Sequence, residues 1–137
     1  MHTVDLNKLD MRELSYADDA AMQITANFPF YAATGNQSSA VVYFEIAPGR
    51  SLGRHTDSAE EIVLILSGVV EASLGDETGQ LSAGQAVLIP AMAPHGVRNI
   101  GDETARCIGF FAAAIVSSTF DQPVLPFGTQ HIGTPTA

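Results

Sequence analysis

Two histidines and two carboxylates in this sequence have the types and the spacing of a metal-binding group. His55 and Asp57 are two residues apart, so in an extended strand their side chains point to the same face. Glu61 follows His55 at another even offset, and His95 comes directly after the tight segment Pro90–Pro94. Two imidazoles and two carboxylates form a mixed nitrogen and oxygen ligand set. Such a set suits a divalent transition metal: Fe, Mn, Ni or Zn.

The glycines and prolines around these residues make the pattern more specific than the spacing alone. The segment 49–68 reads GRSLGRHTDSAEEIVLILSG and resembles the first motif of the cupin family, G-x5-H-x-H-x3,4-E-x6-G, with Asp57 where the second His belongs. The segment 84–99 reads GQAVLIPAMAPHGVRN and resembles the second motif, G-x5-P-x-G-x2-H-x3-N, with Met92 in place of a Gly. The short stretch 69–83 between them is typical of compact, single-domain cupins.

The resemblance implies an all-β fold, a jelly-roll-like cupin β-barrel of two antiparallel sheets. It also implies that a metal is held inside the barrel at the positions of His55, Asp57, Glu61 and His95. Because Asp reaches less far from the backbone than His, Asp57 either binds the metal directly or acts through water or another ligand. Asn99 is four residues beyond His95, on the same strand face, and is expected to be structural.

Alternation along the strands predicts where the neighbours of these residues point. Glu60 and Arg54 are each adjacent to a candidate ligand, and Arg98 follows one at an odd offset. All three are therefore expected on the opposite, solvent-facing side. Cys107 lies in an apolar stretch and is predicted to be a small core side chain.

The elements that would hold the candidate ligands are short strands separated by turns. Runs of β-branched and aromatic residues end at turn clusters such as Pro48-Gly49, Gly75–Gly79 and Gly101–Thr104. Strands at this spacing indicate a sandwich or a closed barrel. The expected strands are 41–47, 62–66, 69–74, 80–81, 86–89, 96–100 and 105–112.

The chain length favours one domain over residues 1–137, because it suffices for one hydrophobic core and is short for two. We expect the core at about 40–112, with irregular terminal segments at 1–20 and 121–137. Within the first part, Met11–Ala21 is predicted to hold a turn of helix. Met22–Ala32 is predicted to supply an extra strand.

The composition excludes several classes of partner. The net charge is −9 and the six Lys and Arg residues are scattered, which argues against nucleic-acid binding. The single cysteine excludes an internal disulfide. The first ten residues have no apolar segment of a secretory signal. The longest apolar stretch, Ile108–Val116, is far below the roughly 18 residues of a membrane span. We therefore expect a cytoplasmic protein without membrane or nucleic-acid partners.

Two classes of function remain open from the sequence. The first is a metal-dependent enzyme acting on a small organic molecule, by dioxygenase, isomerase or lyase-type chemistry. The second is a non-catalytic barrel that binds a small ligand or a metal. The resemblance also implies a homodimer, in which the strand at Met22–Ala32 adds to the sheet of the partner and covers its edge.

Overall fold

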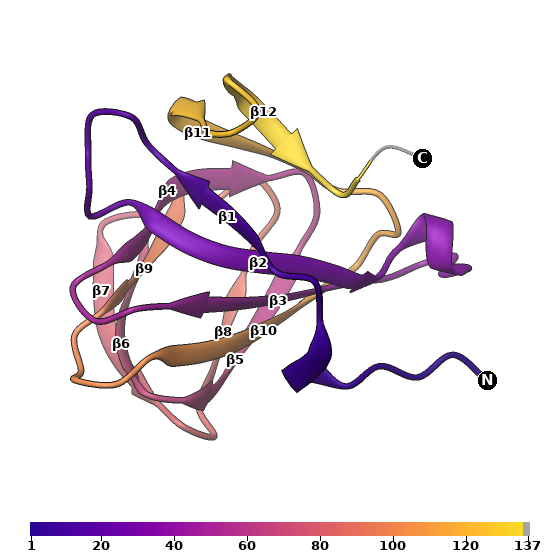
Figure 1. Ribbon diagram of the computed structural model, residues 1–137, viewed down its shortest axis with the longest axis horizontal. Coiled ribbons are helices and arrows are strands. Elements are labelled where there is room, and N and C mark those ends of the chain that lie inside the picture. The colour runs from indigo at the N-terminus through magenta and orange to yellow at the C-terminus, as the bar shows by residue number, and fades with distance from the viewer. Residues whose placement is uncertain (136–137) are drawn as a thin grey trace.

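The computed structural model describes residues 1–135 and consists of two six-stranded antiparallel sheets packed against each other (Figure 1). In the described residues the helical parts are two 3-10 turns, η1 (Leu6–Lys8) and η2 (Ala32–Thr34), and no helix is long and apolar enough to cross a membrane. The strands are β1 (Arg12–Ser15), β2 (Gln23–Phe30), β3 (Ala40–Ile46), β4 (Ser51–Asp57), β5 (Glu61–Ser67), β6 (Val69–Leu74), β7 (Glu77–Ser82), β8 (Ala86–Ile89), β9 (His95–Asn99), β10 (Ala105–Phe111), β11 (Ser117–Val124) and β12 (Thr129–Gly133).

The sheet order explains how distant segments meet. One sheet runs β1-β2-β3-β10-β5-β8 and the other β12-β11-β4-β9-β6-β7. The jelly-roll-like barrel of two antiparallel sheets that the sequence predicts is therefore confirmed. The two motif strands β4 and β9 are neighbours in one sheet, while β5 lies in the other.

The core lies between the two sheets and follows the alternation of the strands. Val42 and Phe44 on β3 and Val63 and Ile65 on β5 are almost fully buried, because every second side chain points inward. Glu61 is in phase with the buried positions of β5, and it is 4% exposed. The alternation that builds the core thus also directs a carboxylate into the barrel.

The N-terminal segment 1–20 is more regular than the sequence suggests. The turn of helix predicted in Met11–Ala21 is wrong, because β1 pairs there with β2 over its whole length and Leu14 packs against the core. The strand predicted at Met22–Ala32 is confirmed as β2. It pairs with β1 and β3 of its own chain, so its backbone hydrogen bonds are used inside the barrel.

The C-terminal segment 121–137 also departs from the expectation of an irregular tail, although residues 136 and 137 lie outside the described part. β11 and β12 form a hairpin (Figure 1, yellow), and β11 joins it to β4 through Ser118–Phe120. Val124 is fully buried in a small hydrophobic cluster with Met22 and Phe120. Burial of these apolar side chains offsets the unfavourable effect of the Pro and Gly residues on strand formation.

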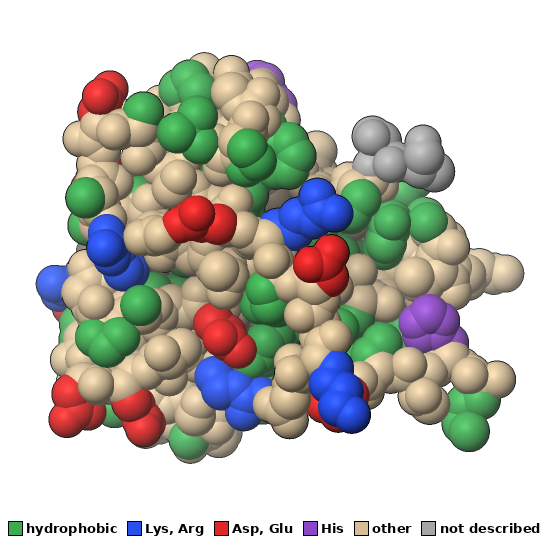
Figure 2. Space-filling model, in the orientation of Figure 1, with side chains coloured by type: hydrophobic (Ala, Val, Ile, Leu, Met, Phe, Trp, Pro, Cys, Tyr) green, Lys and Arg blue, Asp and Glu red, His purple; other side chains and the backbone are tan. Residues whose placement is uncertain are grey.

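The surface carries mixed charges on the face seen in Figure 2. Lys and Arg side chains are scattered there among acidic and apolar ones, and they do not form one basic area. Glu60, Arg54 and Arg98 are all exposed, as the alternation predicts.

Candidate metal centre

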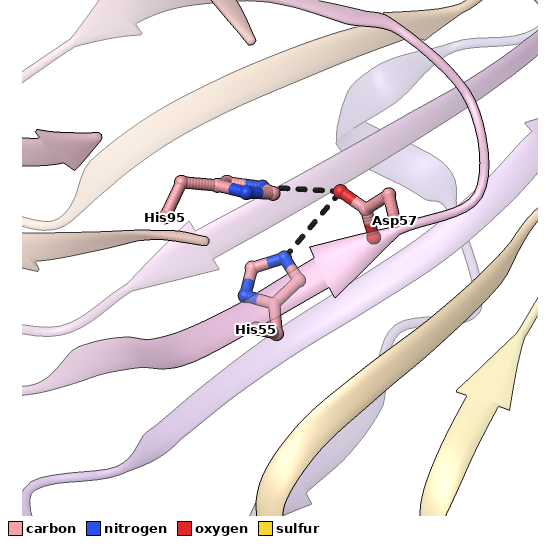
Figure 3. Close-up of side chains that lie close together, drawn as sticks. All are labelled: His55, Asp57 and His95. Atoms are coloured by element: carbon pink, nitrogen blue, oxygen red, sulfur yellow. Dashed lines mark ion pairs between the residues drawn. The ribbon is translucent and has the colours of Figure 1, made fainter. Parts of the chain in front are cut away.

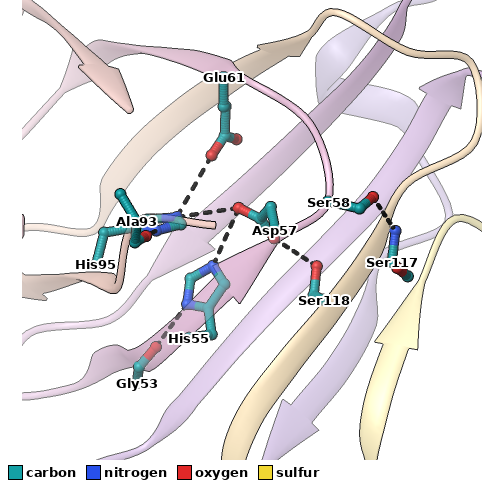
Figure 4. A network of polar contacts seen from close by, with 9 residues as sticks. All are labelled: Gly53, His55, Asp57, Ser58, Glu61, Ala93, His95, Ser117 and Ser118. Atoms are coloured by element: carbon teal, nitrogen blue, oxygen red, sulfur yellow. Dashed lines mark hydrogen bonds and ion pairs between the residues drawn. The ribbon is translucent and has the colours of Figure 1, made fainter. Parts of the chain in front are cut away.

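The four candidate ligands come together in the interior of the barrel, from three strands. His55 and Asp57 lie on β4, Glu61 begins β5 and His95 begins β9 (Figure 4). Their exposed fractions are only 7%, 3%, 4% and 3%. Four ionisable side chains are therefore withdrawn from water at one place, which is costly unless they are compensated there.

Local structure explains this convergence. In β4 the even spacing of His55 and Asp57 puts both side chains on the inner face. His95 is paired with His55 across the sheet, and the centres of their rings are 4.1 Å apart. The segment before His95 is tied to the end of β4, since the Met92 N–H donates to the Asp57 carbonyl at 2.8 Å.

Met92 shows why the second motif has a Gly at its position. Its φ angle is +64°, the left-handed region that favours glycine. The side chain is 60% exposed, so it does not clash with the core, but the backbone conformation costs about 1–2 kcal/mol relative to an ordinary one. The turn before His95 therefore keeps the backbone conformation that favours glycine, although Met92 stands at that position.

The atoms that point at one another are the ones a metal would bind. Asp57 Oδ2 lies 3.0 Å from His95 Nε2 and 3.6 Å from His55 Nε2 (Figure 3). Glu61 Oε1 lies 3.6 Å from His95 Nε2. His55, Asp57 and His95 each offer one ligand atom, and these atoms lie within 4.8 Å of one another. Glu61 reaches this group from the opposite sheet.

Backbone carbonyls determine which ring nitrogens face the centre. His55 Nδ1 is 2.7 Å from the Gly53 carbonyl, and His95 Nδ1 is 2.8 Å from the Ala93 carbonyl (Figure 4). A carbonyl only accepts, so each Nδ1 carries the hydrogen and donates it. In a neutral imidazole this leaves the lone pair on Nε2, on the side of the carboxylates.

Two of the converging atoms lack a hydrogen bond. Asp57 Oδ2 and His95 Nε2 are buried and have no hydrogen-bond partner among the described residues, although they are 3.0 Å apart. A buried polar atom without a hydrogen bond lowers the stability of the fold by about 1–3 kcal/mol. A divalent cation between the nitrogen and the oxygen atoms would satisfy both, so the residues present fit a metal ion.

The pKa shifts in the centre reflect two carboxylates gathered around buried imidazoles. Burial lowers the pKa of His55 to about 4, and the Asp57 carboxylate opposes this only in part. Burial acts on His95 in the same direction, but Asp57 and Glu61 outweigh it and raise the pKa of His95 to about 10. Burial raises the pKa of Glu61. The two carboxylates thus favour a positive charge at His95 Nε2, which either a proton or a metal ion would supply.

Two other residues behave as expected from the sequence. Asn99 is buried and donates from Nδ2 to the carbonyls of Ile46 and Glu103, so it is structural. Cys107 is fully buried, and burial raises the pKa of its thiol to about 12. A protonated, inaccessible thiol is a core side chain and not a nucleophile.

Three residues that contact the ligands were not found by sequence reasoning. Ser118 donates from Oγ to Asp57 Oδ1 at 2.5 Å, and the Phe120 ring is stacked on His55. Both lie beyond the two motifs, and nothing in their spacing marks them. The third is Gly109, where a Cβ atom would collide with the Glu61 carboxylate. An isolated glycine in an apolar strand is a signal of such close approach, and it could have been recognised.

Comparison with known proteins agrees with this fold. Residues 42–111, about half of the chain, match the cupin domain family. The chain therefore belongs to the cupin family. Among characterised relatives, a polyketide synthase protein named CurC from Streptomyces cyaneus is 39% identical over 62 residues, which is 44% of this chain and 40% of that protein. The match thus spans less than half of the relative.

Solved structures show the same fold at low sequence identity. An oxalate decarboxylase from Lactobacillus farciminis has a TM-score of 0.69 at 22% identity, over 82% of this chain and 34% of that one. The polyketide cyclase RemF from Streptomyces resistomycificus has a TM-score of 0.66 at 23% identity, over 81% of this chain and 78% of that one. These similarities establish the cupin barrel and leave the reaction to the residues of the site.

Proposed function

We propose that this chain is a metal-binding cupin that acts on a small organic molecule. The observation that carries the proposal is the convergence of Asp57 Oδ2 and His95 Nε2, two buried atoms without a hydrogen-bond partner in the described residues. His55, Asp57, Glu61 and His95 would hold the ion. A cupin with this fold, the oxalate decarboxylase of Bacillus subtilis, has Mn(II) centres. Two carboxylates likewise favour harder divalent ions over copper.

The chemistry follows from the burial of the site. When bound, a divalent metal supplies Lewis acidity toward carbonyl or enolate oxygens. The protein's own groups contribute the proton transfers: Glu61, whose pKa is raised by burial, can hold or release a proton at its carboxylate when it is detached from the ion. The surrounding apolar side chains, such as Val63 and Val97, exclude water from these groups. Dioxygenase, isomerase and lyase-type reactions all use such an arrangement.

The relatives favour one class of substrate. CurC is a polyketide synthase protein and RemF is a polyketide cyclase. Poly-β-carbonyl chains are rich in the carbonyl and enol oxygens that a buried metal and a carboxylate base can activate. We therefore propose poly-β-carbonyl compounds as the first substrates to test.

The test begins with elemental analysis of protein purified without chelators. Metal-free protein is then titrated with Mn(II), Fe(II), Ni(II) and Zn(II). We expect one equivalent of metal in the wild type and a large loss of affinity in His95→Gln. The control is His131→Gln, which changes an exposed histidine. Equal binding by the two variants would contradict the proposed site.

Turnover separates the enzyme from the non-catalytic alternative. The metal-loaded protein is incubated with diketones, keto acids and poly-β-carbonyl compounds, and the products are followed by mass spectrometry. Metal-dependent turnover supports the enzyme. Metal binding that raises the melting temperature without any turnover would favour the second class, a barrel that binds a ligand or stores a metal.

We also propose that the chain forms a homodimer through the outer face of the sheet that contains β5. Phe110, Ile62 and Leu88 are paired side by side on β10, β5 and β8, and they are 44%, 47% and 54% exposed. An apolar row on an outer sheet face is typical of an interface. Light scattering should give a dimer for the wild type and a monomer for Ile62→Lys, with Ile115→Lys, at an exposed loop position, as control. A monomeric wild type would refute this interface.

A further inference from the structure

Strand β11 lies outside the matched family region and supplies one wall of the candidate metal centre. The family match ends at residue 111, and β11 begins at Ser117. In the sheet, β11 pairs with β4 so that Ser118 is opposite Asp57 and Phe120 is opposite His55. Residues directly opposite in an antiparallel pair are neighbours on the same face. Both β11 side chains therefore contact the ligands of β4 from the inside of the barrel.

Ser118 determines which oxygen of Asp57 is available. Its hydroxyl donates to Asp57 Oδ1 at 2.5 Å, and both residues are buried (Figure 4). The other oxygen, Oδ2, is left pointing toward the Nε2 atoms of His55 and His95. A carboxylate rotates easily about its terminal bond, which has only a broad preference. The hydrogen bond to Ser118 removes this freedom and presents Oδ2 to the centre.

Phe120 fixes the orientation of the neighbouring His55 imidazole. Its ring is stacked on the His55 ring, with the centres 4.6 Å apart and an angle of 11° between the planes. Phe120 itself forms a T-shaped ring pair with Tyr16 and belongs to the small cluster with Met22 and Val124. The imidazole is thereby kept in the plane that directs Nε2 inward and Nδ1 to a backbone carbonyl.

We propose that Ser118 is a positioning residue that makes the short Asp57 side chain a metal ligand at the position where the cupin motif usually has a histidine. This inference rests on the proposed metal site. Asp57 extends less far from β4 than a histidine would, so its direction matters more for reaching the ion. Ser118, on the adjacent strand, sets that direction through one hydrogen bond.

The experiment uses Co(II) as a spectroscopic probe, because its visible absorption depends on the ligands and their geometry. Ser118→Ala is compared with wild type and with Ser117→Ala, which changes the exposed neighbour. We expect Ser118→Ala to lower the affinity for Co(II) by about 10–100-fold and to shift its spectrum, as removal of a group that orients a ligand does. Ser117→Ala should retain both properties of the wild type.

Two further comparisons separate the hydroxyl from packing. Ser118→Thr and Ser118→Val have nearly equal volume and differ in the hydroxyl, so Thr should retain the wild-type spectrum and Val should not. If Ser118→Ala does not fold, the comparison of the Thr and Val variants still tests the role of the hydroxyl. In an Asp57→Ala background, Ser118→Ala should cause no additional loss of affinity, because the residue acts through Asp57.

The outcomes distinguish this inference from the proposed function. If wild type binds no Co(II), the metal site itself is refuted. If wild type binds Co(II) but Ser118→Ala has the same affinity and spectrum, only the role of Ser118 is overturned. Equal spectra for the Thr and Val variants would likewise overturn it.

Discussion

Replacement of Gly109 by alanine should weaken metal binding at the candidate centre without replacing any candidate ligand. Gly109 lies on β10 opposite Val63 of β5, and the Glu61 carboxylate lies over its Cα atom. A Cβ there would be 3.0 Å from Val42 Cγ1 and 3.1 Å from Glu61 Cδ, and closer still to Glu61 Oε2. Ordinary contacts are 3.4–4 Å, so the carboxylate has to move away.

The size of the effect follows from this displacement. Glu61 Oε1 is now 3.6 Å from His95 Nε2, and a shift on the order of 1 Å removes it from a shared ion. Misplacing one ligand in this way should lower metal affinity by at least ten-fold, at the lower end of the effects seen when a ligand loses its orientation. The added methyl group also overpacks the core, at a cost of roughly 1–3 kcal/mol in the free energy of unfolding.

The assay is isothermal titration of metal-free protein with Mn(II), together with thermal unfolding. The control is Gly79→Ala on β7, where a Cβ would meet no atom within 4 Å. If Gly109 acts only through Glu61, then Gly109→Ala should have no further effect on affinity in a Glu61→Ala background. Wild-type affinity in Gly109→Ala, or an additional loss in the double variant, would refute the reasoning.

Three other measurements test Glu61, the stabilisation by metal and the burial of Cys107. Glu61→Gln should lower the affinity for Mn(II) by about ten-fold or more, whereas Glu60→Gln, at the exposed neighbouring position, should not change it; equal effects would contradict the assignment. Chelation of the metal should remove about 2.7 kcal/mol of stability relative to protein at a hundred times its Kd, and lower Tm by roughly 10 °C in calorimetry. An unchanged Tm would count against an ordered ion. Cys107 should resist thiol reagents at pH 8 in the native protein and react after denaturation, because burial raises its pKa to about 12. Since this folded pKa exceeds the unfolded value near 8.5, its contribution to stability is complete below pH 8.5 and declines as the pH rises toward 12. Rapid modification of the folded protein would refute its burial.

The candidate ligands could be predicted from the sequence because their geometry is mostly local. The backbone of an extended strand sends residues two apart to one face, so His55 and Asp57 had to point together wherever β4 lies. The flanking glycines and prolines mark the turns at which β4 and β9 begin and end. For the same reason, the exposure of Glu60 and Arg98 followed from an odd offset alone.

The terminal strands could not be predicted in this way. β1 and β12 are short, and β11 contains two serines and Pro123, so their local preference for a strand is weak. β1 is stabilised by pairing with β2, β11 by pairing with β4, and β12 by pairing with β11. Apolar contacts such as those of Leu14 and Val124 add to this. Tertiary contacts of this kind override local propensity, and only the folded chain displays them.

The sequence by itself thus predicted the types of the candidate ligands, the inward face of each motif strand and, through the cupin resemblance, the barrel. Tertiary structure decided how the ligands are supported. Ser118 is 61 residues from Asp57 along the chain, and Gly109 reaches Glu61 from a separate strand. Strand register between distant segments depends on how whole hydrophobic faces pack, which no local pattern encodes. The orientation of Asp57 and the space for Glu61 are therefore properties of the fold.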